Sequence, residues 1–148
     1  MAILDIGQDL TNVDTNFPIL AVGMYDFSVV EITSKDTESG NGSMLNIKLA
    51  LDENATDIKG NPINVGFPVY DRIFFPKAGA MSKEGKPLDA ASSIKRLAMF
   101  QDAIGKRTAK FDTELYIGCK LTAKVKIRHD STDQYPDTNE IGQYVKKD

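Results

Sequence analysis

The spacing of apolar and polar positions along the chain predicts a mainly β protein with one helix. Side chains alternate between apolar and polar over several segments, which is typical of strands with one buried face. The predicted strands are residues 21–33, 44–51, 67–75 and 115–128, with a short final strand near 140–145. Polar segments separate them and predict a loop at residues 34–43 and a turn or flexible hairpin at residues 52–66.

A helical period replaces the alternation after Asp89, a suitable N-cap, and ends at Gly105, a suitable C-terminal stop. The expected buried stripe contains Ile94, Leu97, Ala98, Gln101 and Ile104. Three strands, one helix and two strands follow one another in the same order in the OB-fold, a five-stranded Greek-key barrel. We therefore expect a mainly β, OB-fold-like barrel with its helix between strands 3 and 4. A small open sheet covered by one helix would give the same pattern.

The 148 residues amount to about one domain. Residues 1–20 have few periodic apolar positions and are expected to form an acidic arm, ahead of a single domain over residues 21–148. Cys119 is the only cysteine, which excludes an internal disulfide. The sequence contains neither a signal-peptide pattern nor an apolar run of the ~20 residues that a membrane span needs. We expect a soluble, cytoplasmic protein with no membrane partner.

Charge is distributed unevenly along the chain. The net charge of −3 argues against a protein that coats nucleic acid by bulk charge alone. Residues 1–40 contain seven acidic side chains and one lysine, so residues 41–148 carry a net charge of +3. Because local fields rather than the total attract a charged ligand, the later part of the chain can present a basic face.

The most basic predicted strand lies around residue 120. Its outward positions are Lys120, Thr122, Lys124, Lys126 and Arg128. Alternation puts these side chains on one face over about 27 Å. Such a row matches a phosphate backbone, from which each ion pair releases a counterion. A solvated edge strand protected from aggregation by its lysines would look the same.

A second candidate element is the predicted strand 67–75. Tyr70, Arg72 and Phe74 share its polar face, and Lys77 follows. Aromatic rings stack on bases without regard to sequence, at about 1–3 kcal/mol per base. We expect Tyr70 to stack and Arg72 to bind phosphate, whereas Phe74 fits the core better.

OB-folds bind oligonucleotides over strands 2 and 3 and over the loops between strands 1 and 2 and between strands 4 and 5. These regions contain Lys48, Lys35 and Tyr135. The candidate DNA-binding residues are therefore Lys35, Lys48, Tyr70, Arg72, Lys77, Lys120, Lys124, Lys126, Arg128 and Tyr135.

Catalytic chemistry finds little support in the sequence. His129 is the only histidine, which excludes a histidine-based metal cluster, and a loop polar role is expected for it. Cys119 is expected to be a small core residue rather than a nucleophile. Since the carboxylates form no metal-binding motif either, we expect no enzyme activity, no metal and no cofactor.

Short segments scattered over most of the chain carry a family resemblance. They are DLTNV at 9–13, LAVGMY at 20–25, MLNI at 44–47, YDRIF at 70–74, LAMFQDAIG at 97–105, LYIGCK at 115–120 and YPDTNEI at 135–141. In this pattern the chain resembles a family of small phage single-stranded DNA-binding proteins found beside recombination genes. The resemblance implies an OB-fold, sequence-tolerant binding of single-stranded DNA in the host cytoplasm, and partners among phage replication or recombination proteins.

One feature departs from the pattern. Many single-strand binding proteins end in an acidic tail that recruits partners, whereas this sequence ends with Lys146, Lys147 and Asp148. The acidic arm is then the candidate recruiting segment.

A different class of protein fits the same residues. In a phage structural or adaptor protein, the β-domain would pack against other subunits. The lysine strand would then be an exposed edge, and the acidic arm would be a segment that docks on another subunit. A homodimer is compatible with both readings. A metal-dependent nuclease is a weaker third reading, because the sequence offers no ligand cluster.

Overall fold

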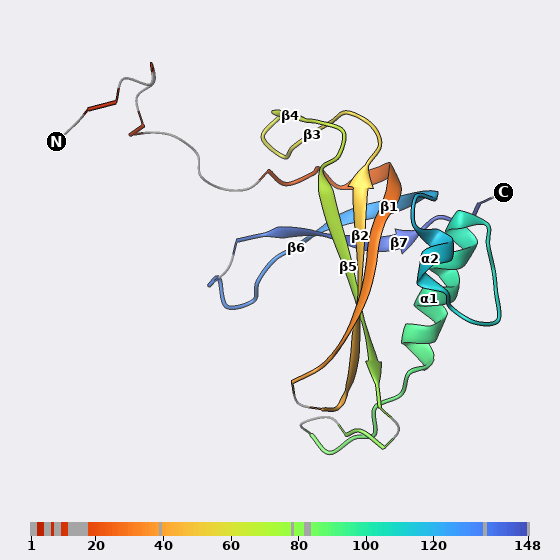
Figure 1. Cartoon of the computed structure of the whole chain (residues 1–148). Helices are drawn as coiled ribbons and strands as arrows, with labels where there is room; N and C mark the ends of the chain where they lie inside the picture. Colours follow the sequence, from red (N-terminus) through yellow and green to blue (C-terminus); the bar gives the residue numbers. More distant parts are fainter. Residues whose placement is uncertain are drawn as a thin grey trace.

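The computed structural model describes residues 3–4, 7, 10–11, 18–38, 40–77, 79–81, 84–134 and 136–147. Its strands are β1 (Gly23–Asp36), β2 (Gly42–Leu51), β3 (Ala55–Thr56), β4 (Pro62–Ile63), β5 (Pro68–Pro76), β6 (Lys120–Arg128) and β7 (Thr138–Tyr144). Its helices are α1 (Ala91–Ile104) and α2 (Thr113–Tyr116). The prediction of a mainly β protein is confirmed (Figure 1).

The main sheet is antiparallel and five-stranded, in the order β5-β2-β1-β6-β7. The long strand β1 joins its two halves, because Gly23–Ser28 pairs with β6 and Phe27–Asp36 pairs with β2. A bulge between Val29 and Glu31 interrupts the second pairing. The β6–β7 pair consequently runs across the β2–β5 pair, and the helices lie beside the crossing (Figure 1).

The core fills the space between the crossed strand pairs. Alternate residues of each strand point into it, as the sequence pattern predicts for Phe27 and Val29 in β1 and for Leu121 and Val125 in β6. Helix α1 contributes Phe100, whose ring lies 5.6 Å from that of Tyr116 in α2 and 5.4 Å from that of Tyr144 in β7. This aromatic cluster fastens both helices to the sheet.

The ends of α1 differ slightly from the prediction. Its N-cap residue is Ala90, while the Asp89 carboxylate accepts a hydrogen bond from the Ala91 N–H at 2.9 Å. Gly105 ends the helix as predicted, with a positive φ of 87° that suits glycine. The predicted buried stripe is wrong at Ile94, which is 59% exposed, and right at Gln101, which is buried and donates to the Tyr116 hydroxyl at 2.8 Å.

Other parts of the fold prediction need correction. The sheet does not close into a barrel, because no strand pairing joins β5 to β7 among the described residues, so the Greek-key barrel is not confirmed. The helix placement also differs. Counting the short β3–β4 hairpin within residues 52–66, α1 follows the fifth strand of the chain rather than the third.

Two predicted boundaries were also wrong. Residues 115–117 are not the start of a long strand, because α2 precedes β6. Strands β1 and β2 extend well into the predicted loop 34–43. The three aspartates of the predicted acidic arm lie outside the described residues. No helix in the described part of the chain is long and apolar enough to cross a membrane.

Candidate nucleic-acid interface

Side chains join the two edge strands of the sheet, β5 and β7. Arg96 of α1 reaches between them, with its Nη2 atom 2.9 Å from Asp71 Oδ1 of β5 and 2.7 Å from the carbonyl oxygen of Ile141 in β7. The Tyr144 hydroxyl of β7 donates to Asp71 Oδ2 at 2.6 Å. The line where β5 and β7 meet is called the seam below, and these contacts hold it together.

The charges at the seam are buried but compensated. The Asp71 side chain is 6% exposed and that of Arg96 is 30% exposed. Burial alone would lower the pKa of Arg96, but the hydrogen bond and charge of Asp71 outweigh it and the pKa is raised. Burial, followed by the charge of Asp71, raises the pKa of Tyr144 well above its ordinary value. Arg96 therefore stays charged and Tyr144 stays protonated.

The outer side of the seam is hollowed and basic. A hollow of about 370 Å³ there is lined by Tyr70 and four cations, Arg72, Arg96, Lys126 and Arg128, which outnumber the two carboxylates in its lining, Asp71 and Glu140. Tyr70 and the four cations define the seam groove. A neighbouring hollow of about 410 Å³ shares Arg72 and Arg128 with it and reaches the loop after β6.

Two cations of the seam groove are unpaired. Arg72 and Arg128 are exposed, and neither forms an ion pair with any residue that the structure describes. Lys126 differs, because its Nζ atom lies 3.2 Å from Glu140 Oε1 of β7. Tyr70 is 41% exposed. The groove thus combines free guanidinium groups with an accessible aromatic ring.

An unpaired acceptor lies next to Arg72. The Oδ1 atom of Asn46 is buried and has no hydrogen-bond partner within the described part of the chain. Asn46 of β2 is opposite Arg72 of β5, and Lys48 is opposite Tyr70. A buried acceptor without a partner costs about 1–3 kcal/mol.

The remaining predicted site residues lie elsewhere. Lys120 and Lys124 are exposed on β6 beyond the groove, where Lys124 is opposite Met24 of β1. Lys35 and Lys77 are at the far tip of the β1–β2 and β2–β5 pairs (Figure 1). Phe74 is half-buried, with its ring close to Gly42. Tyr135 lies outside the described residues.

The loop that follows β6 is acidic and organised by His129. The His129 Nδ1 atom lies 2.6 Å from Asp137 Oδ1, and its Nε2 atom lies 2.8 Å from Asp133 Oδ1. The hydrogen bond and charge of Asp137, together with the hydrogen bond of Asp133, raise the pKa of His129. A protonated imidazole can donate to both carboxylates, whereas a neutral one can donate to only one.

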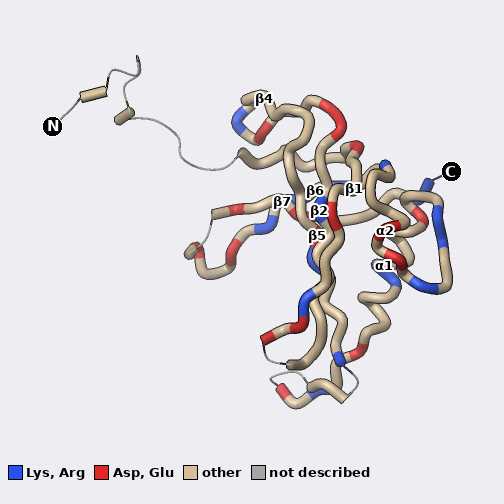
Figure 2. The backbone as a smooth tube through the Cα atoms, viewed as in Figure 1, with Lys and Arg blue, Asp and Glu red and all other residues tan. Residues whose placement is uncertain are grey.

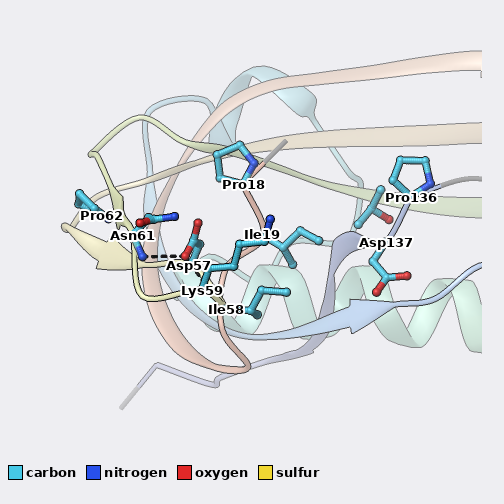
Figure 3. Close-up of a pocket in the computed structure, with 10 residues that line it drawn as sticks. Pro18, Ile19, Asp57, Ile58, Lys59, Asn61, Pro62, Pro136 and Asp137 are labelled. Atoms are coloured by element: carbon cyan, nitrogen blue, oxygen red, sulfur yellow. Dashed lines mark hydrogen bonds between the residues drawn. The ribbon is translucent and has the colours of Figure 1, made fainter. Parts of the chain in front are cut away.

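A third hollow, of about 530 Å³, is bordered by Pro136 and Asp137 of this loop (Figure 3). Its walls are largely apolar and include Pro18, Ile58 and Pro136. The Asp57 carboxylate in it is already used, because it accepts hydrogen bonds from the backbone N–H groups of Lys59 and Asn61, both at 2.8 Å. The lining of the hollow includes one cation, Lys59, beside two carboxylates and no aromatic ring, so we leave the hollow out of the candidate interface.

Sequence reasoning missed Arg96. The signal that could have found it is Asp71, which alternates with Val69 and Ile73 and therefore falls on the inward face of β5. A carboxylate at such a position needs a buried partner. Among the described residues, no three His, Cys, Asp or Glu side chains gather in a way that could hold a metal ion.

No protein-family model matches the chain, and a search of curated proteins found no similar sequence.

Proposed function

We propose that this protein binds single-stranded DNA in the seam groove without catalysing a reaction. The observation that carries the proposal is the pair of unpaired guanidinium groups, Arg72 and Arg128, next to the exposed ring of Tyr70. The arginines would contact phosphates and the ring would stack on a base, the combination by which proteins bind single strands with little regard to sequence.

We also propose that the fold is an open relative of the OB-fold barrel. When only the strands of the main sheet are numbered along the chain, their order is 3-2-1-4-5. Joining the first and last of these would close a barrel, and the OB-fold itself is a partly open one. The contacts of Arg96 with β5 and β7 support this interpretation, because they bring the two edge strands together. The groove then lies on strand 3 and beside the loop between strands 4 and 5, the regions that OB-folds use for oligonucleotides.

The charge balance favours single strands over duplexes. With a net charge of −3, the protein as a whole has no excess of positive charge to attract duplex DNA. The two unpaired groove cations, Arg72 and Arg128, would give a dependence of log affinity on log salt of about −1.4 for a single strand. Stacking on Tyr70 needs a base whose face is free, which a duplex does not offer.

A role in phage replication or recombination, with proteins of those processes as partners, remains part of the proposal. It rests on the resemblance of the short sequence segments described above to small phage single-stranded DNA-binding proteins.

A structural or adaptor role is the second candidate. It is favoured by the exposed apolar side chains Val22 and Met24 at the start of β1, which are 58% and 65% exposed. Gel filtration of the nucleic-acid-free protein separates the two. A large assembly favours the adaptor, whereas a monomer favours the DNA-binding protein.

Fluorescence anisotropy tests the proposal. The labelled probes are an oligo-thymidine of about 30 nucleotides, longer than the ~4–16 nucleotides that one OB-fold covers, a matched duplex and a matched RNA. We expect salt-sensitive binding of the oligo-thymidine and weaker binding of the duplex. No binding of the oligo-thymidine at low salt would refute the proposal. The RNA shows whether the groove distinguishes the two sugars.

A further inference from the structure

The structure contains a second group of basic side chains, at the other end of the β6–β7 pair from the seam groove. Its members are Lys106, Arg107, Lys120, Lys146 and Lys147, and we call it the second basic patch. Figure 2 shows basic segments at the C-terminal end of the chain and beside the helices. The residues come from the segment after α1, from the first position of β6 and from the segment after β7.

Backbone and side-chain contacts hold these residues together. The Lys147 N–H donates to the carbonyl oxygen of Asp102 at 3.1 Å, and the Lys147 stem lies against Gly105, where an added Cβ would be 3.1 Å from Lys147 Cδ. Lys106 Nζ lies 3.5 Å from the Sγ atom of Cys119, the residue before Lys120. A hollow of about 580 Å³ is lined by Lys120, Lys146 and Lys147 together.

The lysines of this patch are not neutralised by ion pairs. Asp102 is occupied by Arg107, with Nη2–Oδ2 and Nε–Oδ1 distances of 2.8 and 2.9 Å. Asp26 and Asp52 also line the hollow, and they accept hydrogen bonds from the hydroxyl groups of Thr122 and Ser28. None of the four lysines forms an ion pair with a residue in the described ranges. The patch therefore keeps an excess of positive charge.

Strand β6 connects the patch to the seam groove. Lys120 is at its first position and Arg128 at its last, about 27 Å apart at 3.3 Å per residue. The exposed side chain of Lys124 lies between them, next to Gln143 and Met24 rather than an acid. At the ~3.4 Å of axial rise per phosphate in a stacked strand, this path corresponds to roughly eight phosphates.

We propose that a single strand bound in the seam groove continues along β6 and that the second basic patch holds its phosphates. This inference rests on the proposed function, since it concerns a longer part of the same DNA. Lys120 and Lys124, which lie outside the groove, would then contact the strand along this path.

Oligonucleotide length tests the inference. Two labelled oligo-thymidines, of roughly six and twelve nucleotides, fall within the ~4–16 nucleotides of one OB-fold, and only the longer spans the whole path. The patch variant combines Lys106→Gln, Lys146→Gln and Lys147→Gln. The control variant combines Lys35→Gln, Lys77→Gln and Lys86→Gln, all away from the path. Both change the net charge of the chain from −3 to −6.

We expect the patch variant to bind the twelve-mer about tenfold more weakly and to lose about two units of salt slope, since each phosphate contact on a single strand contributes ~0.7. The six-mer should bind both variants as it binds the unmodified protein. A variant with Lys106→Arg, Lys146→Arg and Lys147→Arg should keep its twelve-mer affinity, because it keeps the positive charges. Unchanged six-mer binding by the patch variant excludes misfolding as the cause of its weaker twelve-mer binding.

Three results would overturn the inference while leaving the proposed function intact. They are equal affinity of the unmodified protein for the two oligonucleotides, an equal loss in the patch and control variants, and an unchanged twelve-mer affinity in the patch variant. The last would assign the lysines to another partner. If the unmodified protein binds neither oligonucleotide, the proposed function itself fails.

Discussion

Two arginines at the seam have the same chemistry and different surroundings. Arg96 reaches inward from α1 and contacts Asp71, the Ile141 carbonyl oxygen and the ring of Tyr144, 5.4 Å from its guanidinium carbon. Arg72 follows Asp71 directly in sequence, yet it lies on the opposite face of β5, exposed and without an ion pair to any described residue. The difference teaches that the direction in which each arginine points, inward from α1 or outward from β5, decides whether its charge holds the seam or stays free for a ligand.

Replacing the inner arginine should have the largest effect. Arg96→Met leaves the buried carboxylate of Asp71 without its cation, and breaking such a pair costs about 3 kcal/mol of unfolding free energy. Arg72→Gln should stay within about 0.5 kcal/mol, as expected for a surface substitution. Urea unfolding measures both. Equal stabilities of the two variants would contradict the distinction between the arginines.

Removing the outer arginines should affect binding instead. Arg72→Gln combined with Arg128→Gln removes two charge-assisted contacts with phosphate, for an expected loss of about 100-fold in affinity for a single strand. Anisotropy titration measures the loss, and urea unfolding should show an unchanged midpoint. A pair of distant changes, Lys35→Gln with Lys77→Gln, serves as the control. The groove assignment is wrong if the control loses as much affinity.

The same comparison between the outer and inner sides of the seam can be made with two tyrosines, for which we expect smaller changes in affinity and stability. Tyr70→Leu removes the exposed ring and should weaken single-strand binding by about 1.5 kcal/mol, roughly tenfold, because one base loses its stacking partner. Tyr144→Phe removes the hydroxyl that donates to Asp71 and should cost about 1 kcal/mol of stability. We expect Tyr70→Leu to lower the affinity and leave the free energy of unfolding unchanged, and Tyr144→Phe to lower the free energy of unfolding and leave the affinity unchanged. Anisotropy titration and urea unfolding of both variants measure these changes. Loss of binding in Tyr144→Phe alone would reverse the assignment.

The pH dependence of the loop after β6 should be the smallest effect. Because Asp137 and Asp133 raise the pKa of His129 above its ordinary 6.5, the stabilisation is fully present below that value and is lost as pH rises through the folded-state pKa. The protonated form also brings positive charge next to Arg128. We therefore expect both loop order and single-strand affinity to decline as the pH rises through the folded-state pKa of His129. NMR titration of His129 measures the pKa, and a value at or below 6.5 would contradict the account.

The strands could be predicted from the sequence because each has one buried face. Alternation at Phe27 and Val29 or at Leu121 and Val125 is a direct consequence of a half-buried strand. The pattern failed at residues 115–117, where the apolar side chains fit both the period of a strand and that of a helix. There Asp112 accepts the Glu114 N–H and caps the short helix α2, and Gly118, with a φ of 84°, turns the chain into β6.

The groove could be predicted only in part, because alternation gives the face of a residue and not its neighbours across the sheet. Tyr70, Arg72, Lys126 and Arg128 were predicted as candidates from their faces alone. Their gathering depends on β5 and β7 meeting at the seam, a contact between the ends of the sheet that no local pattern encodes. Arg96 escaped prediction for the same reason, since its partner Asp71 is 25 residues away.

Photo-crosslinking tests the central claim most directly. An oligo-thymidine carrying a photoreactive base is bound to the unmodified protein, irradiated and mapped by mass spectrometry. The account predicts crosslinks at Tyr70 and in the peptides of β5 and of the β6–β7 pair. Crosslinks confined to the tip that carries Lys35 and Lys77 would contradict it.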